Sequence, residues 1–171
     1  PKNNKSLLLS HETPPAMATG VRDGAEVAVR AGIRHILFTV LPEENAVSVD
    51  EYLKSLRPVP SPWLENGSLS PPAERGKLVF EAADCGRCHP APLFTDLQQH
   101  QVGTGTGREE DTPFDTPTLV EVWRTAPYLY DGRATTIKEV LTTFNPDDRH
   151  GETSKLSPEE LDDLVQYVLS L

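Results

Sequence analysis

The residues with the clearest chemistry are Cys85, Cys88 and His89, which read C-x-x-C-H along the chain. This spacing is the attachment signature of a c-type haem. Each thiol can form a thioether with one vinyl group of the porphyrin, and the histidine that follows can ligate the iron from the proximal side. The sequence therefore predicts one covalently attached haem c in this chain.

The two cysteines of this motif are the only ones in the chain, which argues against the other uses of such a pair. A structural zinc site needs four ligands, usually with a second Cys or His pair at short spacing. A thioredoxin-like redox pair is expected beside a β-α-β pattern, whereas the flanking sequence here has helical spacing. Haem attachment is the interpretation that these observations favour.

Length and charge narrow the class of protein and its partners. The chain has 171 residues, enough for one domain or two small ones, and a formal net charge of −10. This charge argues against nucleic acid as a partner, and no apolar run is long enough to span a bilayer. Because the first residue is Pro1 rather than Met, we expect a mature product or a fragment. Thioether attachment is made outside the cytoplasm, so we expect a periplasmic or otherwise exported protein.

Apolar residues at helical spacing, preceded by capping signals, predict five helices and an all-α fold with no sheet. Ser157 with Glu160, and Thr136 with Glu139, have the spacing of capping boxes. Ser70, followed by two prolines, is expected to begin the helix that leads to the C-x-x-C-H. The other helices are expected at residues 23–38 and 48–56, and the helix after Thr136 is expected to reach Phe144.

The two parts of the chain resemble each other. The Thr-Ala-Pro turn at residues 125–127 lies 112 positions after a Thr-Pro-Pro turn at residues 13–15. The closing phrase at residues 166–171 lies 115 positions after a similar phrase at residues 51–56. The second copy has a C-x-x-C-H before its turn, whereas the first copy would need one before Pro1.

This repeat predicts the domain organisation. Residues 1–57 are expected to be the C-terminal half of a related module without its C-x-x-C-H, and residues 58–72 a Pro-rich linker or strap. Residues 73–171 are expected to be a complete cytochrome c-like haem domain. A second haem is expected in the upstream part of the same parent protein. Residues 90–118 have neither helical nor strand period, and we expect this long loop to pack against the haem edge.

Several motifs after the C-x-x-C-H resemble the C-terminal haem domain of bacterial di-haem cytochrome c peroxidases and MauG-like proteins. In the order of that family, the chain has Pro92-Leu93-Phe94-Thr95-Asp96, Gly103, Asp115-Thr116-Pro117-Thr118-Leu119, Thr125-Ala126-Pro127-Tyr128 and Asp131-Gly132-Arg133. The resemblance covers about residues 70–171. It implies a mostly helical cytochrome c fold, in which the helix bearing Gly76 and Phe80 crosses the terminal helix bearing Tyr167.

The chain departs from this family on the far side of the haem. It has Tyr130 where the family usually has His, and Phe144 near the family's distal Met or Tyr ligand. For the ligand opposite His89, the first choice is His150, on a loop able to fold back over the iron. Tyr130 is the second, because a tyrosinate can ligate ferric haem. An open or water-bound iron is the third alternative, and it would favour peroxide chemistry.

Four other side chains are candidates for the surroundings of the haem, and a fifth is not. Arg124 and Arg133 could pair with the haem propionates, and a solvated guanidinium is the plainer alternative for both. Trp123 could form a wall of the haem site or pack in the core. His100 is expected to form a hydrogen bond rather than to ligate iron, and His11 is expected at the surface.

These features support two functions. The first is electron transfer by a c-type cytochrome module, to or from another haem domain or redox protein. The second is that of a di-haem cytochrome c peroxidase or MauG-like oxidoreductase with peroxide as oxidant, which needs an open iron position and a polar group beside it. A third reading is a haem tail attached to a larger sensor or propeller-type protein.

Overall fold

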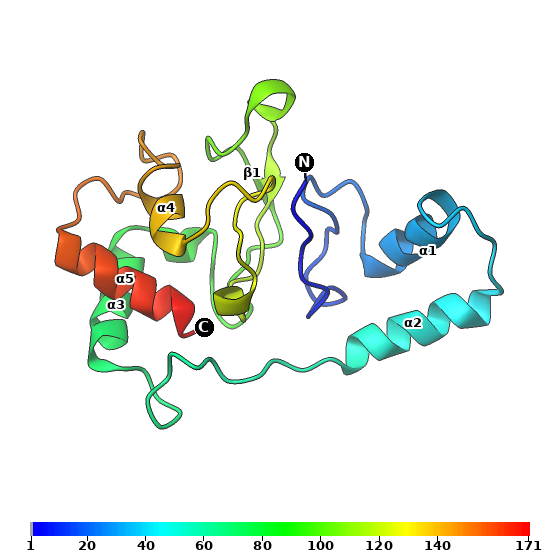
Figure 1. The fold of residues 1–171 in the computed structure, drawn as a ribbon, viewed down its shortest axis with the longest axis horizontal. Coiled ribbons are helices and arrows are strands. Elements are labelled where there is room, and N and C mark those ends of the chain that lie inside the picture. Colours follow the sequence, from blue (N-terminus) through cyan, green and yellow to red (C-terminus); the bar gives the residue numbers. More distant parts are fainter. Residues whose placement is uncertain (1) are drawn as a thin grey trace.

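The computed structural model describes residues 2–171, so that only Pro1 of the predicted first segment lies outside it. The described chain is mainly helical (Figure 1), which confirms the expected helical class. Its five α-helices are α1 (Ala25–His35), α2 (Glu43–Ser55), α3 (Pro71–Ala82), α4 (Ile137–Leu141) and α5 (Pro158–Leu169). Three one-turn 3₁₀ helices lie between them: η1 (Cys85–Arg87), η2 (Gly107–Glu109) and η3 (Val122–Arg124).

A small sheet lies in the long loop for which no strand was expected. Strand β1 (Gln99–His100) pairs antiparallel with β2 (Phe114–Asp115), and His100 lies opposite Phe114. The expectation of a fold without any sheet was therefore wrong in this detail. Strands of two residues are too short to produce an alternating pattern in a sequence.

Three of the five helices, α3, α4 and α5, begin at the caps that the sequence predicts, whereas α1 and α2 begin without a side-chain cap. Capping boxes begin α4 at Thr136 and α5 at Ser157, and Ser70 caps α3, as expected. The predicted start of α2 at Ser48 was wrong, because α2 begins five residues earlier, at Glu43. Inside this helix the Ser48 hydroxyl donates to the Glu44 carbonyl, 2.8 Å away, and therefore caps nothing.

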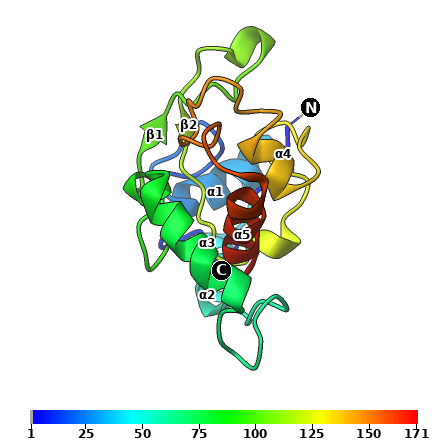
Figure 2. The same cartoon turned by 90° about the vertical axis from the view of Figure 1, so that its left-hand side faces the viewer.

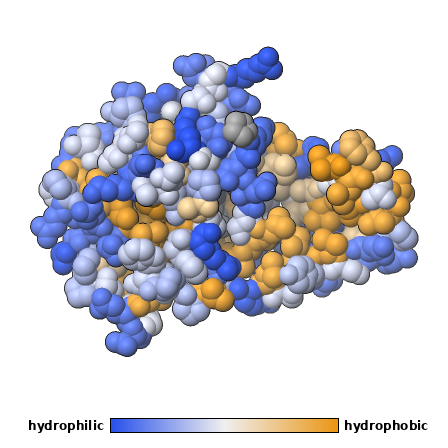
Figure 3. Space-filling model, in the orientation of Figure 1, coloured by the Kyte–Doolittle hydropathy of each residue, from blue (hydrophilic) through white to orange (hydrophobic). Residues whose placement is uncertain are grey.

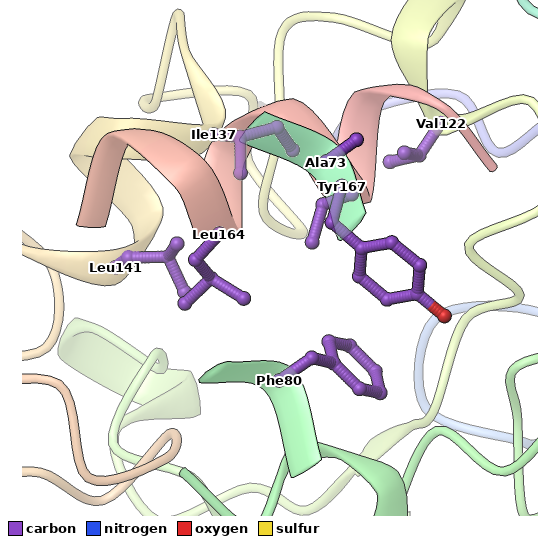
Figure 4. Close-up of a cluster of buried hydrophobic side chains, with 8 residues drawn as sticks. Ala73, Phe80, Val122, Ile137, Leu141, Leu164 and Tyr167 are labelled. Atoms are coloured by element: carbon purple, nitrogen blue, oxygen red, sulfur yellow. The ribbon is translucent and has the colours of Figure 1, made fainter. Parts of the chain in front are cut away.

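The hydrophobic core lies where α3 crosses α5 (Figure 2). Gly76 allows the two backbones to touch, since a Cβ there would lie 1.9 Å from the Asp163 carbonyl oxygen. One turn further on, the rings of Phe80 and Tyr167 meet edge to face, with centroids 5.3 Å apart. Figure 4 shows these rings beside the fully buried Leu164. The crossing implied by the family resemblance is confirmed.

The Pro-rich segment before α3 lies along the C-terminal part of the chain and is bonded to it. The Val59 N–H donates to Glu121 Oε1 (2.5 Å), and the Ser61 hydroxyl donates to the Leu169 carbonyl (2.6 Å). Glu121 is itself buried and forms an ion pair with Arg124. This segment is therefore a strap fastened to the helical core.

The sequence repeat has a counterpart in the backbone. An isolated antiparallel bridge joins Ala16 to Arg22, and another joins Tyr128 to Ala134, each residue 112 positions later. Helix α4 likewise begins 112 positions after α1, and α5 begins 115 positions after α2. Left-handed residues recur at the same offset, at Leu9 and Glu121 (φ 59° for both) and at Met17 and Leu129 (φ 74° and 68°).

The first part of the chain has a docked segment and a projecting helix pair. The Asn3 N–H donates to the Tyr130 carbonyl (2.6 Å), and the Asp115 N–H donates to the Ala18 carbonyl (3.0 Å). Helices α1 and α2 project to the right in Figure 1, away from α3 and α5. Figure 3 shows that much of the surface over α1 and α2 is apolar. The exposed apolar residues there include Ile36, Leu37, Phe38, Val40, Val47, Val49 and Tyr52.

A buried ionic cluster joins α1, α2 and the segment before them. His11 Nε2 lies 3.2 Å from Asp50 Oδ1, and Arg30 Nη1 lies 2.6 Å from Asp50 Oδ2. The side chain of His11 is only 6% exposed, so the expectation that it lies at the surface was wrong.

Within residues 2–171, no helix is long and apolar enough to cross a membrane.

Candidate haem-binding site

The C-x-x-C-H forms a tight turn directly after α3. Asp84 has a left-handed backbone (φ 60°), which ends the helix and begins the 3₁₀ helix η1. The His89 N–H then donates to the Cys85 carbonyl (2.9 Å) and closes the turn. Residues three apart in a 3₁₀ helix lie on the same side, so this turn presents Cys85 and Cys88 together. Both are free thiols and half-buried.

The protonation state of Cys85 suits a thioether better than a metal thiolate. Burial raises the pKa of the Cys85 thiol to about 11, so at neutral pH this sulfur is uncharged. A thiolate ligand would have to carry a charge in this buried position. A thioether sulfur is neutral and has no such cost.

His89 is buried and held in a defined orientation. Its Nδ1–H donates to the Phe94 carbonyl, 2.8 Å away, which leaves the lone pair on Nε2. Burial lowers the pKa of His89, which favours the neutral imidazole that binds metals. A hydrogen bond from the second ring nitrogen is the usual support of a metal-ligating histidine. His89 therefore has the features of the proximal ligand.

The ring of His150 lies close to the ring of His89. The two ring centroids are 6.5 Å apart, and the ring planes are inclined by 45°. A metal ion that binds one nitrogen of each ring, at about 2 Å from each, sets the two ring centroids roughly 6 Å apart. Burial, with a smaller effect of His89, lowers the pKa of His150 to about 4. The centroid separation and the neutral state of both rings meet two requirements for ligation of one iron by both histidines.

The loop between α4 and α5 holds His150 through its backbone. The buried Asn145 side chain accepts the His150 N–H (2.8 Å) and donates to the carbonyls of His150 (3.2 Å) and Gly151 (2.9 Å). The loop also contacts the attachment turn, because a Cβ at Gly151 would lie 3.7 Å from Cys85 Sγ. Asn145 thus places the loop over the same turn that carries both thiols.

Tyr130, the second choice for the distal ligand, has its hydroxyl bonded elsewhere. Its oxygen lies 2.8 Å from Thr106 Oγ1, and its ring stacks on Phe114 with centroids 4.7 Å apart. The guanidinium of Arg133 lies 5.1 Å from the centroid of Phe144 and 5.9 Å from that of Tyr130. Tyr130 and Phe144 therefore enclose an arginine.

The two arginines expected beside the propionates differ in their pairing. Arg124 forms an ion pair with Glu121 and lies over the ring of Trp123. Arg133 forms an ion pair with Asp131 (3.5 Å) and donates to the Thr104 carbonyl, but its buried Nε has no hydrogen-bond partner among the described residues. The same is true of the buried indole nitrogen of Trp123. Buried donors are normally paired, so each of these two N–H groups lacks the acceptor that burial ordinarily requires.

For Trp123 the sequence favours core packing over contact with the haem. Its one polar atom, the indole N–H, is the signal that could have favoured contact, because a buried Trp usually finds an acceptor. His100, in contrast, behaves as expected. Its Nε2 lies 2.7 Å from Asp96 Oδ2, so it forms a hydrogen bond to a carboxylate beside the attachment turn.

Comparison with known proteins identifies the class of this chain. The family model of cytochrome c matches residues 73–171. The chain belongs to the cytochrome c family, which implies a c-type haem. The matched residues begin in α3 and include the attachment turn, His150 and the terminal helix.

Three curated proteins are similar to this chain. Hydrazine synthase subunit gamma of Kuenenia stuttgartiensis is 33% identical, over 70% of this chain and 47% of that protein. The methylamine utilization protein MauG of Methylophilus methylotrophus is 29% identical, over 61% and 38%. The cytochrome-c peroxidase IdrP1 of Denitromonas iodatirespirans is 27% identical, over 63% and 42%. The chain thus spans less than half the length of these relatives.

A solved structure of the Kuenenia stuttgartiensis hydrazine synthase extends the similarity to residues before the haem domain. It matches 99% of this chain and 72% of that chain, with 27% identity and a TM-score of 0.85. The resemblance to the MauG and peroxidase proteins, inferred from the motifs, is confirmed by these relatives.

Proposed function

We propose that residues 73–171 form an electron-transfer module, with one haem bound through Cys85 and Cys88 and ligated by His89 and His150. The observation that carries this proposal is the approach of the two imidazole rings, with centroids 6.5 Å apart. The bound haem supplies a one-electron redox centre. Two fixed protein ligands keep the coordination the same in both oxidation states, which favours transfer of an electron over binding of a substrate.

The remaining residues of the site bind and shield the cofactor in this proposal. Arg133 and Trp123 direct unpaired N–H groups to the propionates. Arg124 pairs with Glu121 and holds that buried carboxylate in this proposal. The Phe94 carbonyl fixes the proximal ring, and Phe80, which contacts both Phe94 and Tyr167, keeps water from the attachment side.

The electronic spectrum of the haem-loaded chain tests the assignment of both ligands. We expect a six-coordinate low-spin spectrum in the oxidised and reduced forms, unchanged by peroxide. His150→Ala should convert the oxidised form to high spin, whereas the control Tyr130→Phe should leave the spectrum unchanged. A high-spin spectrum of the unaltered chain that changes on addition of peroxide would contradict the proposal and support an open iron.

A second candidate function is that of a MauG-like or peroxidase-like oxidoreductase that uses peroxide. The names of two relatives, MauG and a cytochrome-c peroxidase, favour it. In that case the chain would supply electrons to a reaction at a second haem. A role as part of a larger assembly is a related possibility, since another relative is a subunit of hydrazine synthase.

We also propose that residues 1–57 are the C-terminal half of a second haem module, completed by an upstream part of the same parent protein. The repeated bridges and helix starts support this proposal. Burial supports it too. Val49 and Tyr52 of α2 lie 115 positions before Leu164 and Tyr167 of α5. The two residues of α5 are 0% and 6% exposed beneath α3, whereas Val49 and Tyr52 are 40% and 63% exposed.

The coding sequence before Pro1 and the haem content of the longer product test this second proposal. We expect a C-x-x-C-H upstream and two haems for each polypeptide, with export signals in the same gene. The present chain should bind one haem. A longer product that binds only one haem would contradict the proposal, even if the repeat in the backbone is real.

A further inference from the structure

The dipeptide Arg-His occurs twice in the chain, at residues 34–35 and at residues 149–150. The two copies lie 115 positions apart, and this is also the distance along the chain between the starts of α2 and α5, at Glu43 and Pro158. Each histidine therefore lies eight positions before the next helix. The histidine of the second copy is the proposed distal ligand of the haem, so its counterpart in the first copy is a candidate for the same role.

The two histidines are reached by segments of different local structure. Helix α1 continues as far as His35. Helix α4 ends at Leu141, and a loop then carries the chain to His150. Measured from the helix starts, the second segment is three residues longer, which is the difference between the offsets of 112 and 115. The extra residues thus precede the second Arg-His, and from that pair onward the two copies are in register.

His35 lies at an exposed apolar part of the surface. The residue itself is exposed, and the three residues after it, Ile36, Leu37 and Phe38, are 74%, 68% and 86% exposed. Large apolar side chains that are exposed side by side mark a binding surface. A porphyrin is flat and largely apolar, and its burial against these side chains would remove both from water. A neutral imidazole is the commonest metal ligand, so the residues at the end of α1 fit a haem.

We propose that His35 is the distal iron ligand of the second haem, which the upstream half of the first module would carry. This inference rests on the proposed half module of residues 1–57 and takes His150 as its template. Both haems of the parent protein then have two histidine ligands. Haem iron with two protein ligands serves electron transfer, whereas binding of oxygen species needs an open position. The parent protein would therefore pass electrons between two haems and offer a substrate no open iron.

Electron paramagnetic resonance of the oxidised parent protein, loaded with both haems, tests this inference because it separates high-spin from low-spin ferric haem. We expect two low-spin haems in the unaltered protein. His35→Ala should convert one of them to high spin, and His150→Ala should convert the other. Arg34→Ala, which removes the neighbouring side chain and leaves the imidazole, is the matched control and should keep both haems low spin.

A methionine variant distinguishes ligation from a structural role. His35→Met supplies a different iron ligand, so the affected haem should stay low spin while its reduction potential rises, as it does for methionine ligation. The potential of the other haem should not change. If His35→Ala loses its second haem, the potentials of His35→Met still decide, and two unchanged potentials would contradict the inference.

The outcomes separate this inference from the proposals behind it. A parent protein with a single haem would overturn the half module, and this inference with it. If the parent protein has two haems and His35→Ala changes the spin state of neither, this inference fails and the half module stands. If His35→Ala converts one haem whereas His150→Ala converts none, ligation by His35 stands and the assignment of His150 is wrong.

Discussion

Helices α2 and α5 occupy corresponding places in the two parts of the chain, yet only α5 has its apolar face covered. Leu164 and Tyr167 of α5 lie under α3, whereas Val49 and Tyr52 at the corresponding positions of α2 face outward. Both helices have the same apolar spacing and follow the same type of turn. The difference shows that apolar spacing alone does not bury a helix face: α3 packs on α5, and no helix of residues 2–171 covers Val49 and Tyr52 in the same way.

The largest expected effect comes from truncating the same position on both helices. Leu164→Ala should lower the free energy of unfolding by about 3 to 5 kcal/mol, because it leaves a cavity in a fully buried site. Val49→Ala should change it by roughly 0.5 kcal/mol or less, as for an exposed position. Denaturant unfolding of the haem-loaded chain, monitored by circular dichroism, measures the free energy of unfolding of both variants.

The same pair of variants in the longer parent protein would sharpen this difference. If an upstream helix covers α2, Val49→Ala becomes costly there, by about 1 kcal/mol or more. Equal small effects of Val49→Ala in the short and long proteins would mean that α2 remains uncovered.

The second prediction exchanges a residue between the two parts. Leu9 and Glu121 have the same left-handed backbone, 112 positions apart, but only the glutamate can bind the Pro-rich strap. Glu121→Leu leaves the Val59 N–H and the Arg124 guanidinium without their acceptor. It should cost about 1 to 3 kcal/mol.

Limited proteolysis checks the cause of this loss, because a strap released from Glu121 should be cleaved faster between residues 58 and 70. Glu121→Gln is the matched control, since its amide oxygen can still accept the Val59 N–H. If Glu121→Leu destabilises the protein without faster cleavage of the strap, the buried ion pair with Arg124 is the cause instead.

The third prediction concerns the cluster of His11, Arg30 and Asp50 in the first part of the chain. Burial raises the pKa of Asp50, but the hydrogen bonds from Arg30 and His11 outweigh it and hold the pKa below its ordinary value. The folded state therefore gains stability from the charged carboxylate above the unfolded pKa near 4, and loses this gain as the pH falls through the lower folded pKa. At position 165, which corresponds to Asp50, the second part has a valine.

Acid titration should thus loosen α1 and α2 before the α3–α5 core. Hydrogen exchange along the chain measures this order directly. Asp50→Asn should remove the pH dependence of α1 and α2 and leave that of the second part unchanged. Simultaneous exchange in both parts at low pH would show that the cluster does not set the acid stability of the first part.

What could be predicted from the sequence was mostly local. The attachment turn could be predicted from Cys85, Cys88 and His89 alone. The starts of α4 and α5 could be predicted from pairs of capping residues that lie three positions apart in the sequence. The order of motifs predicted the α3–α5 crossing through the family resemblance. His150 was a preference among alternatives, because its approach to His89 depends on how Asn145 closes a loop of the folded chain.

What could not be predicted depends on residues far apart in the chain. The burial of His11 requires Asp50, 39 positions away, and Arg30 on a third segment. The two short strands pair through a loop without periodic sequence. The buried N–H groups of Trp123 and Arg133 have no hydrogen-bond partner among the described residues, and this can be recognised only once the positions of all nearby acceptors are known.

The smallest expected effect compares the two serines that the sequence marks as helix starts. Ser157 caps α5, where its hydroxyl accepts the Glu160 N–H at 3.2 Å, so Ser157→Ala should cost about 1 kcal/mol. Ser48 lies inside α2 and bonds back to the Glu44 carbonyl. Ser48→Ala should therefore be neutral or stabilise by a few tenths of a kcal/mol, roughly the gain in helix propensity. Denaturant midpoints of the two variants check this order, and a loss at Ser48 as large as that at Ser157 would mean that α2 begins at Ser48 in solution.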